Sequence, residues 1–233
     1  MVTKRENVAS QFGGDSKATV VPYPDNCNRR LKKMPLPGNA LLHTLRYFIG
    51  LDSANTQTTN AEQERLQHYA TGCRRAVEIG VAEGVNTRSI AESLAEDGVL
   101  YAIDPFFSGR LSVCWGELIA RAQVRRGGLE ERVRFIQMLS WEACDKIDGT
   151  FDFVFIDGDH SLDGIRRDWA DWSKKVQREG IIALHDTNIP PNESDRSKLG
   201  SHKYFQSVIQ HDERFRIVEQ VDSLSILQRK AQE

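Results

Sequence analysis

Short apolar runs alternate with amphipathic stretches along most of the chain after residue 73. The runs have the length and the β-branched and aromatic content of strands, and apolar residues recur at helical spacing between them, as Ile90 and Leu94 do. This alternation predicts a parallel sheet flanked by helices. Strands are expected at 74–81, 98–104, 133–139, 151–157 and 180–185, with helices near 86–97, 111–126, 141–147 and 161–176.

The pattern changes near the C-terminus. Residues 215–221 alternate apolar and polar side chains, Asp222 and Ser223 are turn formers, and residues 224–227 alternate back. This predicts an antiparallel hairpin that closes the sheet. The expected fold class is therefore α/β, with a doubly wound, mostly parallel seven-stranded sheet that ends in a hairpin.

The N-terminal part of the chain has a different character. Residues 1–38 are polar, are interrupted by glycine and proline, and carry the basic stretch 29–33, which predicts a flexible arm with a solvated basic segment. Residues 39–72 contain two helical patterns, near 41–49 and 61–70, and predict a helical extension that caps the main domain at 73–233.

The most informative stretch is VEIGVAEGVNT at residues 77–87, which predicts a strand, a tight turn and the start of a helix. Such a turn directs backbone N–H groups at a ligand, and Gly80 and Gly84 allow that ligand to approach closely. The turn lacks the glycine spacing that accommodates a pyrophosphate. S-adenosylmethionine carries no phosphate: Glu78 could hold its ammonium, and the N–H groups around Gly80, Val81 and Gly84 its carboxylate. An ordinary strand-to-helix turn is the alternative.

The second strand ends in the sequence YAIDPF. Asp104 lies 24 positions after Gly80, close to the spacing of the acid that binds ribose hydroxyls in nucleoside-binding βαβ units. Asp104 is thus expected to accept hydrogen bonds from the ribose, beside Pro105, and Phe106 could pack against the adenine. The alternative is that Asp104 only forms a turn before the proline.

Four motifs in this order resemble the class I S-adenosylmethionine-dependent methyltransferases over residues 74–230. Within that superfamily, the chain is most similar to bacterial cephalosporin-hydroxylase-like and macrocin O-methyltransferase groups, and more distantly to catechol O-methyltransferase. The resemblance implies a Rossmann-like fold, a small-molecule acceptor with a hydroxyl group, adenine contacts at Ser140 and Trp141, and N-terminal helices that cover the active site or form a homodimer contact. The motifs are VEIGVAEGVNT at 77–87, YAIDPF at 101–106, FDFVFIDGDH at 151–160 and GIIALHDT at 180–187.

Polar side chains follow the fourth and fifth strands, and strand ends of this kind converge on one cleft. Methyl transfer to a hydroxyl needs a general base or a divalent cation that binds the oxygen. For the base, His160 and Asp159 are the candidates. Asp159 could instead cap the following helix. The candidate catalytic residues at this edge are Asp157, Asp159, His160 and His185.

The resemblance also implies possible metal ligands. One ligand of the metal-dependent families ends the fourth strand, matching Asp157, and a polar pair ends the fifth, matching His185 and Asp186. Such a set would suit Mg²⁺ or Mn²⁺. Catechol O-methyltransferase has an acid followed by an amide where this chain has a histidine followed by an aspartate, so the presence of a metal stays open. Residues 187–203 are expected to form a long polar loop that contributes to acceptor selectivity.

The composition excludes several classes of protein function. The chain has 233 residues, 39% of them hydrophobic, and a net charge of −2, which predicts a soluble, cytoplasmic protein that binds neither nucleic acid nor membrane. Its four scattered cysteines predict neither a zinc site nor a redox pair. Two rivals remain: a nicotinamide-dependent oxidoreductase, which the C-terminal hairpin disfavours, and a noncatalytic ligand-binding relative of the same fold.

Overall fold

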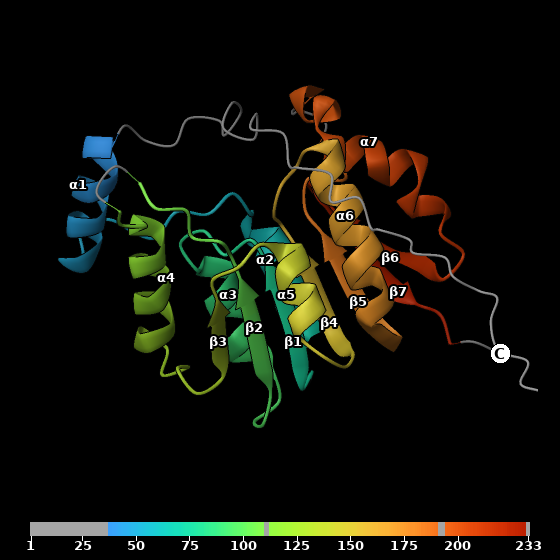
Figure 1. Ribbon diagram of the computed structural model, residues 1–233, viewed down its shortest axis with the longest axis horizontal. Coiled ribbons are helices and arrows are strands. Elements are labelled where there is room, and N and C mark those ends of the chain that lie inside the picture. The colour runs from blue at the N-terminus through green and yellow to red at the C-terminus, as the bar shows by residue number, and fades with distance from the viewer. Residues whose placement is uncertain (1–36, 110–111, 191–193, 232–233) are drawn as a thin grey trace, which may run out of the picture. The chain divides into compact units, whose positions relative to one another are not determined.

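The computed structural model describes residues 37–109, 112–190 and 194–231 (Figure 1). The predicted arm lies outside these residues, apart from its last two positions. Contacts group residues 37–233 into one compact unit, so the helical segment at 39–72 belongs to the same unit as the sheet. None of the helices among the described residues is long and apolar enough to cross a membrane.

Seven strands form one sheet in the order β3-β2-β1-β4-β5-β7-β6. The first five pair in parallel, and β7 runs antiparallel to both β5 and β6 (Figure 1). The predicted α/β sheet with its closing hairpin is therefore confirmed. The strands are β1 (Arg75–Ile79), β2 (Val99–Ile103), β3 (Val133–Ile136), β4 (Phe151–Ile156), β5 (Val176–Leu184), β6 (Phe215–Val221) and β7 (Leu224–Arg229).

Helices follow most strands and pack on both faces of the sheet. They are α1 (Pro37–Phe48), α2 (Asn60–Ala70), α3 (Val85–Ser93), α4 (Trp115–Arg126), α5 (Ser140–Lys146), α6 (Leu162–Trp172) and α7 (Gly200–Ser207), with short 3-10 helices η2 (Ser173–Lys175), η3 (Ser194–Lys198) and η4 (Ile209–His211).

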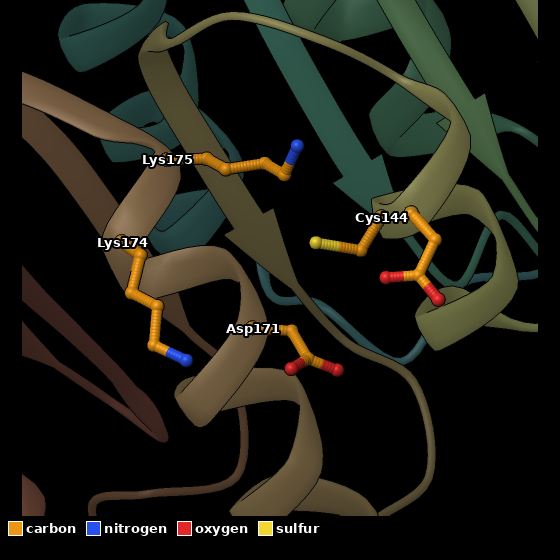
Figure 2. A pocket seen from close by; sticks show the side chains of 5 residues that line it. Cys144, Asp171, Lys174 and Lys175 are labelled. Atoms are coloured by element: carbon orange, nitrogen blue, oxygen red, sulfur yellow. The ribbon is translucent and has the colours of Figure 1, made fainter. Parts of the chain in front are cut away.

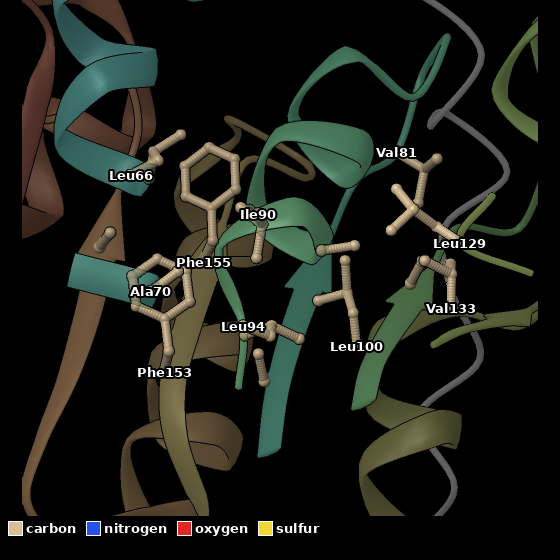
Figure 3. Close-up of a cluster of buried hydrophobic side chains, with 14 of the residues drawn as sticks. Leu66, Ala70, Val81, Ile90, Leu94, Leu100, Leu129, Val133, Phe153 and Phe155 are labelled. Atoms are coloured by element: carbon tan, nitrogen blue, oxygen red, sulfur yellow. The ribbon is translucent and has the colours of Figure 1, made fainter. Parts of the chain in front are cut away.

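The two faces of the sheet carry separate hydrophobic clusters because successive strand side chains point to opposite sides. One cluster packs β1, β2 and β4 against α2, α3 and α4, and Figure 3 shows it around Phe153 and Phe155. The other packs the same strands against α5, α6 and α7 through residues such as Val77 and Trp172. In β1, Ala76 belongs to the first cluster, so alternation places Glu78 on that face, beneath α3.

The structure differs from the predicted elements in two places. Strand β5 begins at Val176, where the sequence predicted the end of a helix. Residues 177–179 are polar and exposed, and the pairing with β4 shifts register there, so this part of the strand lacks the apolar run that would have predicted it. The predicted loop at 187–203 contains η3 and the start of α7. Helix α7 begins at Gly200, where a side chain would overlap the backbone of Leu162. Because glycine is a poor helix former, this start resembles a loop in the sequence.

Candidate active site

Two glycines shape the turn after β1. Gly80 has φ +88°, and a Cβ on it would overlap the backbone carbonyl of Asp157, which follows β4. Gly84 has φ +76°, caps the N-terminus of α3, and would place a Cβ 2.7 Å from the Cα of Ala120 in α4. Both positions therefore need glycine for close approach as well as for the left-handed backbone.

Glu78 lies directly beneath this turn and is completely buried. Neither of its carboxyl oxygens has a hydrogen-bond partner, and the buried hydroxyl of Thr87 beside it has none either. Burial raises the pKa of Glu78 well above its usual value. The nearby Thr87 hydroxyl opposes this effect, although it lies outside good hydrogen-bond geometry, and the charges of Asp157 and Asp104 add to it. A buried carboxyl group without a partner is rare in folded proteins, so this one marks a place for a donor or a cation.

Asp104 ends β2 and is held by the turn itself. Its Oδ2 accepts hydrogen bonds from the N–H groups of Val81 (2.9 Å) and Ala82 (3.3 Å), and its Oδ1 accepts one from Phe106 (2.7 Å). The N–H groups that were expected to bind the cofactor's carboxylate thus donate to Asp104 in this structure. Oδ1 keeps capacity for one further donor, which suits a ribose hydroxyl.

The three predicted adenine contacts lie in different environments. The ring of Phe106 is 2% exposed and packs against Phe135 in the core, so only its backbone serves the turn. Trp141 is half-buried, with the guanidinium of Arg167 5.1 Å from its ring centre. Contact with adenine remains a prediction for Ser140 and Trp141, whereas the position of the Phe106 ring leaves it little surface for stacking.

Ser140 opens α5 and links it to α6. Its hydroxyl donates to Asp168 (2.5 Å) and accepts a hydrogen bond from the indole of Trp172 (2.8 Å). Burial raises the pKa of Asp168 to about 6. These contacts fix the start of α5 at the same edge of the sheet as Asp104.

His185 lies between two carboxylates at the end of β5. Its Nδ1 is 2.9 Å from Oδ1 of Asp157, and its Nε2 is 3.4 Å from Oε2 of Glu62 and 3.1 Å from the hydroxyl of Ser223. Burial alone would lower the pKa of His185, but the nearby carboxylates outweigh it and raise that pKa to about 9. Burial would raise the pKa of Glu62, whereas His185, Ser223 and the Thr59 backbone lower it to about 2.

This charge arrangement predicts a pH dependence of stability. The folded-state pKa of His185 is about 9, above the unfolded value of 6.5, so its contribution is fully present below pH 6.5 and is lost as the pH rises through 9. The difference corresponds to about 3 kcal/mol of unfolding free energy. Urea unfolding at pH 6.0 and 9.5 should show this loss in the wild type and much less of it in His185→Gln. The same loss in both proteins would contradict the assignment.

His160 lies beside the same carboxylates. Its Nδ1 is 3.1 Å from Oδ2 of Asp186 and its Nε2 is 3.5 Å from Oδ1 of Asp157. Burial lowers the pKa of His160 despite these neighbours, and the charges of His185 and Arg196 act in the same direction. The side chain is 30% exposed, so His160 combines a neutral imidazole with access to the site.

The carboxylate of Asp159 is held by Ser161 at the start of α6. Its two carboxylate oxygens accept hydrogen bonds from the backbone N–H and the hydroxyl of Ser161, at 2.9 and 2.8 Å, and Ser161 in turn caps α6. The N-cap of α6 is thus Ser161 and not Asp159, which supports the cap without being it. A role for Asp159 as a base remains a prediction, with His160 the better-placed group.

Comparisons with known proteins agree with this geometry. Residues 77–187 match the family described as "Methyltransferase domain". These residues are just under half of the chain, and over them the chain is similar to a methyltransferase domain. A caffeoyl-CoA O-methyltransferase from Populus kitakamiensis is 31% identical over 119 residues, which is 49% of this chain and 47% of that protein. The chain spans less than half the length of the curated relatives that it matches.

Solved structures share the fold of the methyltransferase domain. The O-methyltransferase from Bacillus cereus in complex with SAH superposes with a TM-score of 0.59 at 18% identity, covering 84% of this chain and 93% of the other. The O-methyltransferase TomG from Streptomyces achromogenes, in complex with SAM, gives 0.58 at 15% identity over 86% of this chain and 93% of its own.

The proposed metal ligands of the methyltransferase domain do not form a ligand set. Both ring nitrogens of His185 face other polar groups in a fully buried position. The carboxylate of Asp186 contacts Arg196 and His160. Within the described ranges, no group of three or more histidine, cysteine, aspartate or glutamate side chains is arranged to hold a metal ion. In this structure, His185, His160 and Arg196 contact Asp157 and Asp186, and a divalent cation there stays a prediction.

Sequence reasoning missed two residues of this site. Glu62 carries the capping-box signal T-x-x-E at residues 59–62, which predicts its helix position but not its contact with His185. Glu83, treated as a spacer in the turn, accepts hydrogen bonds from the backbone of Asn55 (2.5 Å) and contacts His43 (3.1 Å). Both contacts join the helical segment at 39–72 to the methyltransferase site.

A separate hollow of about 330 Å³ lies elsewhere on the domain (Figure 2). Cys144, Asp171, Lys174 and Lys175 line it at the C-terminal ends of α5 and α6. Helices of this fold run opposite to the strands, so the hollow belongs to the edge where the strands begin. It is therefore distinct from the edge that carries Asp104 and Asp157.

Proposed function

We propose that the protein transfers a methyl group from S-adenosylmethionine to a hydroxyl group of a small molecule. The observation that carries the proposal is Glu78, a fully buried carboxyl without a partner beneath a glycine turn. The α-ammonium of the cofactor would supply the missing charge. The match to a methyltransferase domain and the likeness to O-methyltransferases support this function.

The cofactor would lie across the carboxyl ends of β1, β2 and β3. Glu78 would hold the ammonium, and Asp104, followed by Pro105, would accept the ribose hydroxyls. The N–H groups of Gly80, Val81 and Gly84 donate within the protein, so the turn would bind the amino-acid carboxylate by exchanging those acceptors for it. Ser140 and Trp141 face the adenine. The buried Glu78 and the partly exposed Asp104 favour a ligand with a cation at one end and hydroxyl donors in the middle.

The acceptor would approach from the ends of β4 and β5. In the transfer, the acceptor oxygen forms a bond to the methyl carbon, the carbon–sulfur bond breaks with its electron pair going to sulfur, and the hydroxyl proton passes to a base. His160 takes this role because its lowered pKa keeps the imidazole neutral, with Asp157 and Asp186 beside it to stabilise the imidazolium that forms. No step is assigned to a metal. A homodimer stays a prediction.

Calorimetry distinguishes this function from its rivals. SAH should bind to the purified protein, whereas NAD⁺ should not, and methyl-labelled S-adenosylmethionine should label at least one member of a panel of phenols, sugars and catechols. Binding of NAD⁺ without SAH would instead support the oxidoreductase. Binding of SAH with no transfer to any acceptor, including bulk hydroxyl compounds at high concentration, would support the noncatalytic relative.

A further inference from the structure

We infer that Glu62 of α2 is a positioning residue of the active site, which fixes the side chain of Asp157 through His185. The inference rests on the proposed function and adds a part of the N-terminal helical segment to the catalytic apparatus. It follows from three groups that lie in a row, Glu62, His185 and Asp157, and that come from α2, the end of β5 and the end of β4.

Glu62 is held rigidly at the buried end of this row. It is 1% exposed, and its Oε1 accepts hydrogen bonds from the N–H (2.8 Å) and the hydroxyl (2.6 Å) of Ser223 in the β6–β7 turn. Its Oε2 accepts one from the N–H of Thr59 (2.8 Å) and faces Nε2 of His185. Four contacts, one from the neighbouring Thr59 and three from the distant Ser223 and His185, hold this carboxylate.

His185 transmits that orientation. The ring is fully buried, its backbone N–H donates to the carbonyl of Ile156 in β4, and its two nitrogens face Glu62 and Asp157. Nδ1 contacts Asp157 as an ion pair without hydrogen-bond geometry, whereas Nε2 makes a hydrogen bond with the hydroxyl of Ser223, which itself donates to Glu62. Turning the ring would break this hydrogen bond and both contacts with the carboxylates. Two contacts therefore position Asp157: Gly80 packs against its backbone carbonyl, and Nδ1 of His185 lies 2.9 Å from its Oδ1.

The row leads from the core to the surface. The side chains of Glu62 and His185 are 1% and 0% exposed, whereas that of Asp157 is 17% exposed and faces the site. Buried ion pairs of this kind stabilise a fold little more than apolar packing would. Their effect here is geometric: the carboxylate that faces the acceptor is set by groups that no substrate touches.

Glu62→Gln tests the inference. Glutamine also serves in a capping box, so its one carbonyl oxygen can still accept from the N–H of Thr59 while the charge that faces His185 is removed. Its amide nitrogen then replaces the oxygen that accepts from Ser223. We expect kcat to fall about 10- to 100-fold, since a small displacement of a reacting group has effects of this size. The Kd for SAH should stay within a factor of about three, because Glu62 is outside the proposed cofactor site. A crystal structure of the variant should show the Asp157 carboxylate displaced from its 2.9 Å contact with His185.

Two further variants sharpen the test. Glu64→Gln, on the exposed side of the same helix, should match the wild type in every measurement. Glu62→Gln/His185→Gln should lose no more kcat than His185→Gln alone, because both residues act along one path. This comparison still tests the inference if the single variant Glu62→Gln is poorly folded. Additive losses, or an unmoved Asp157 with unchanged kcat, would overturn the inference. If the wild type transfers no methyl group, the proposed function fails, while the position of Asp157 in the crystal still decides the role of Glu62.

Discussion

Glu78→Gln is expected to lower the affinity for SAH about 100-fold and, at the same time, to stabilise the ligand-free protein. The loss of affinity has the size seen when one partner of a buried charge pair is removed. The gain in stability has a separate cause. The buried carboxyl of Glu78 has only the Thr87 hydroxyl beside it and no cation, so replacing it by a neutral amide of the same shape relieves an unfavourable burial of charge.

The unfolding free energy gained by Glu78→Gln depends on pH. The folded-state pKa of Glu78 is raised, so the carboxyl contributes most favourably at low pH and becomes unfavourable as the pH rises through that value. The stabilisation by glutamine should therefore grow with pH and reach about 1–3 kcal/mol at pH 8.

Urea unfolding at pH 5 and pH 8, with calorimetric titration of SAH, measures both effects. Glu92→Gln is the matched control, since Glu92 lies in α3, above Glu78, and pairs on the surface with Arg88. It should change neither quantity by much. A less stable Glu78→Gln protein with normal SAH binding would show that Glu78 has a structural partner and does not hold the cofactor.

The features that the sequence predicts well are those that depend on local pattern. Strands β1 to β4 follow from apolar runs, and the burial of Glu78 follows from its place in one of them. Gly80 could be identified because a left-handed turn after a strand admits few other residues. The ribose-binding role of Asp104 was inferred from spacing and is consistent with its position at the turn.

The features that the sequence does not predict depend on contacts between distant segments. Nothing near Glu62 indicates that it meets His185, which lies 123 positions later. The ring of Phe106 packs in the core and its backbone has a φ of +44°, neither of which a local pattern signals. The metal prediction came from a family resemblance at Asp157, His185 and Asp186. It could not include the contact of Arg196 with Asp186, which joins residues ten positions apart across the loop after β5.

The second large effect is expected for Gly80→Ala, which should destabilise the protein by about 4 kcal/mol or more and abolish SAH binding. The added methyl group would overlap the carbonyl of Asp157, so β1 and β4 could not keep their register at the site. Losses of this size come from few mechanisms, and an unavoidable backbone clash is one of them.

Gly128→Ala separates the clash from the strain of a left-handed residue. Gly128 has φ +65°, similar to Gly80, but a Cβ there meets nothing within 4 Å. Gly128→Ala should lower the unfolding free energy by about 1 kcal/mol, the cost of a left-handed backbone for alanine, and leave SAH binding intact. The difference between the two variants in urea unfolding measures the contact between Gly80 and Asp157 alone. Equal costs would mean that this close approach is absent in solution, and Asp157 would then lose the backbone support on which its place in the active site depends.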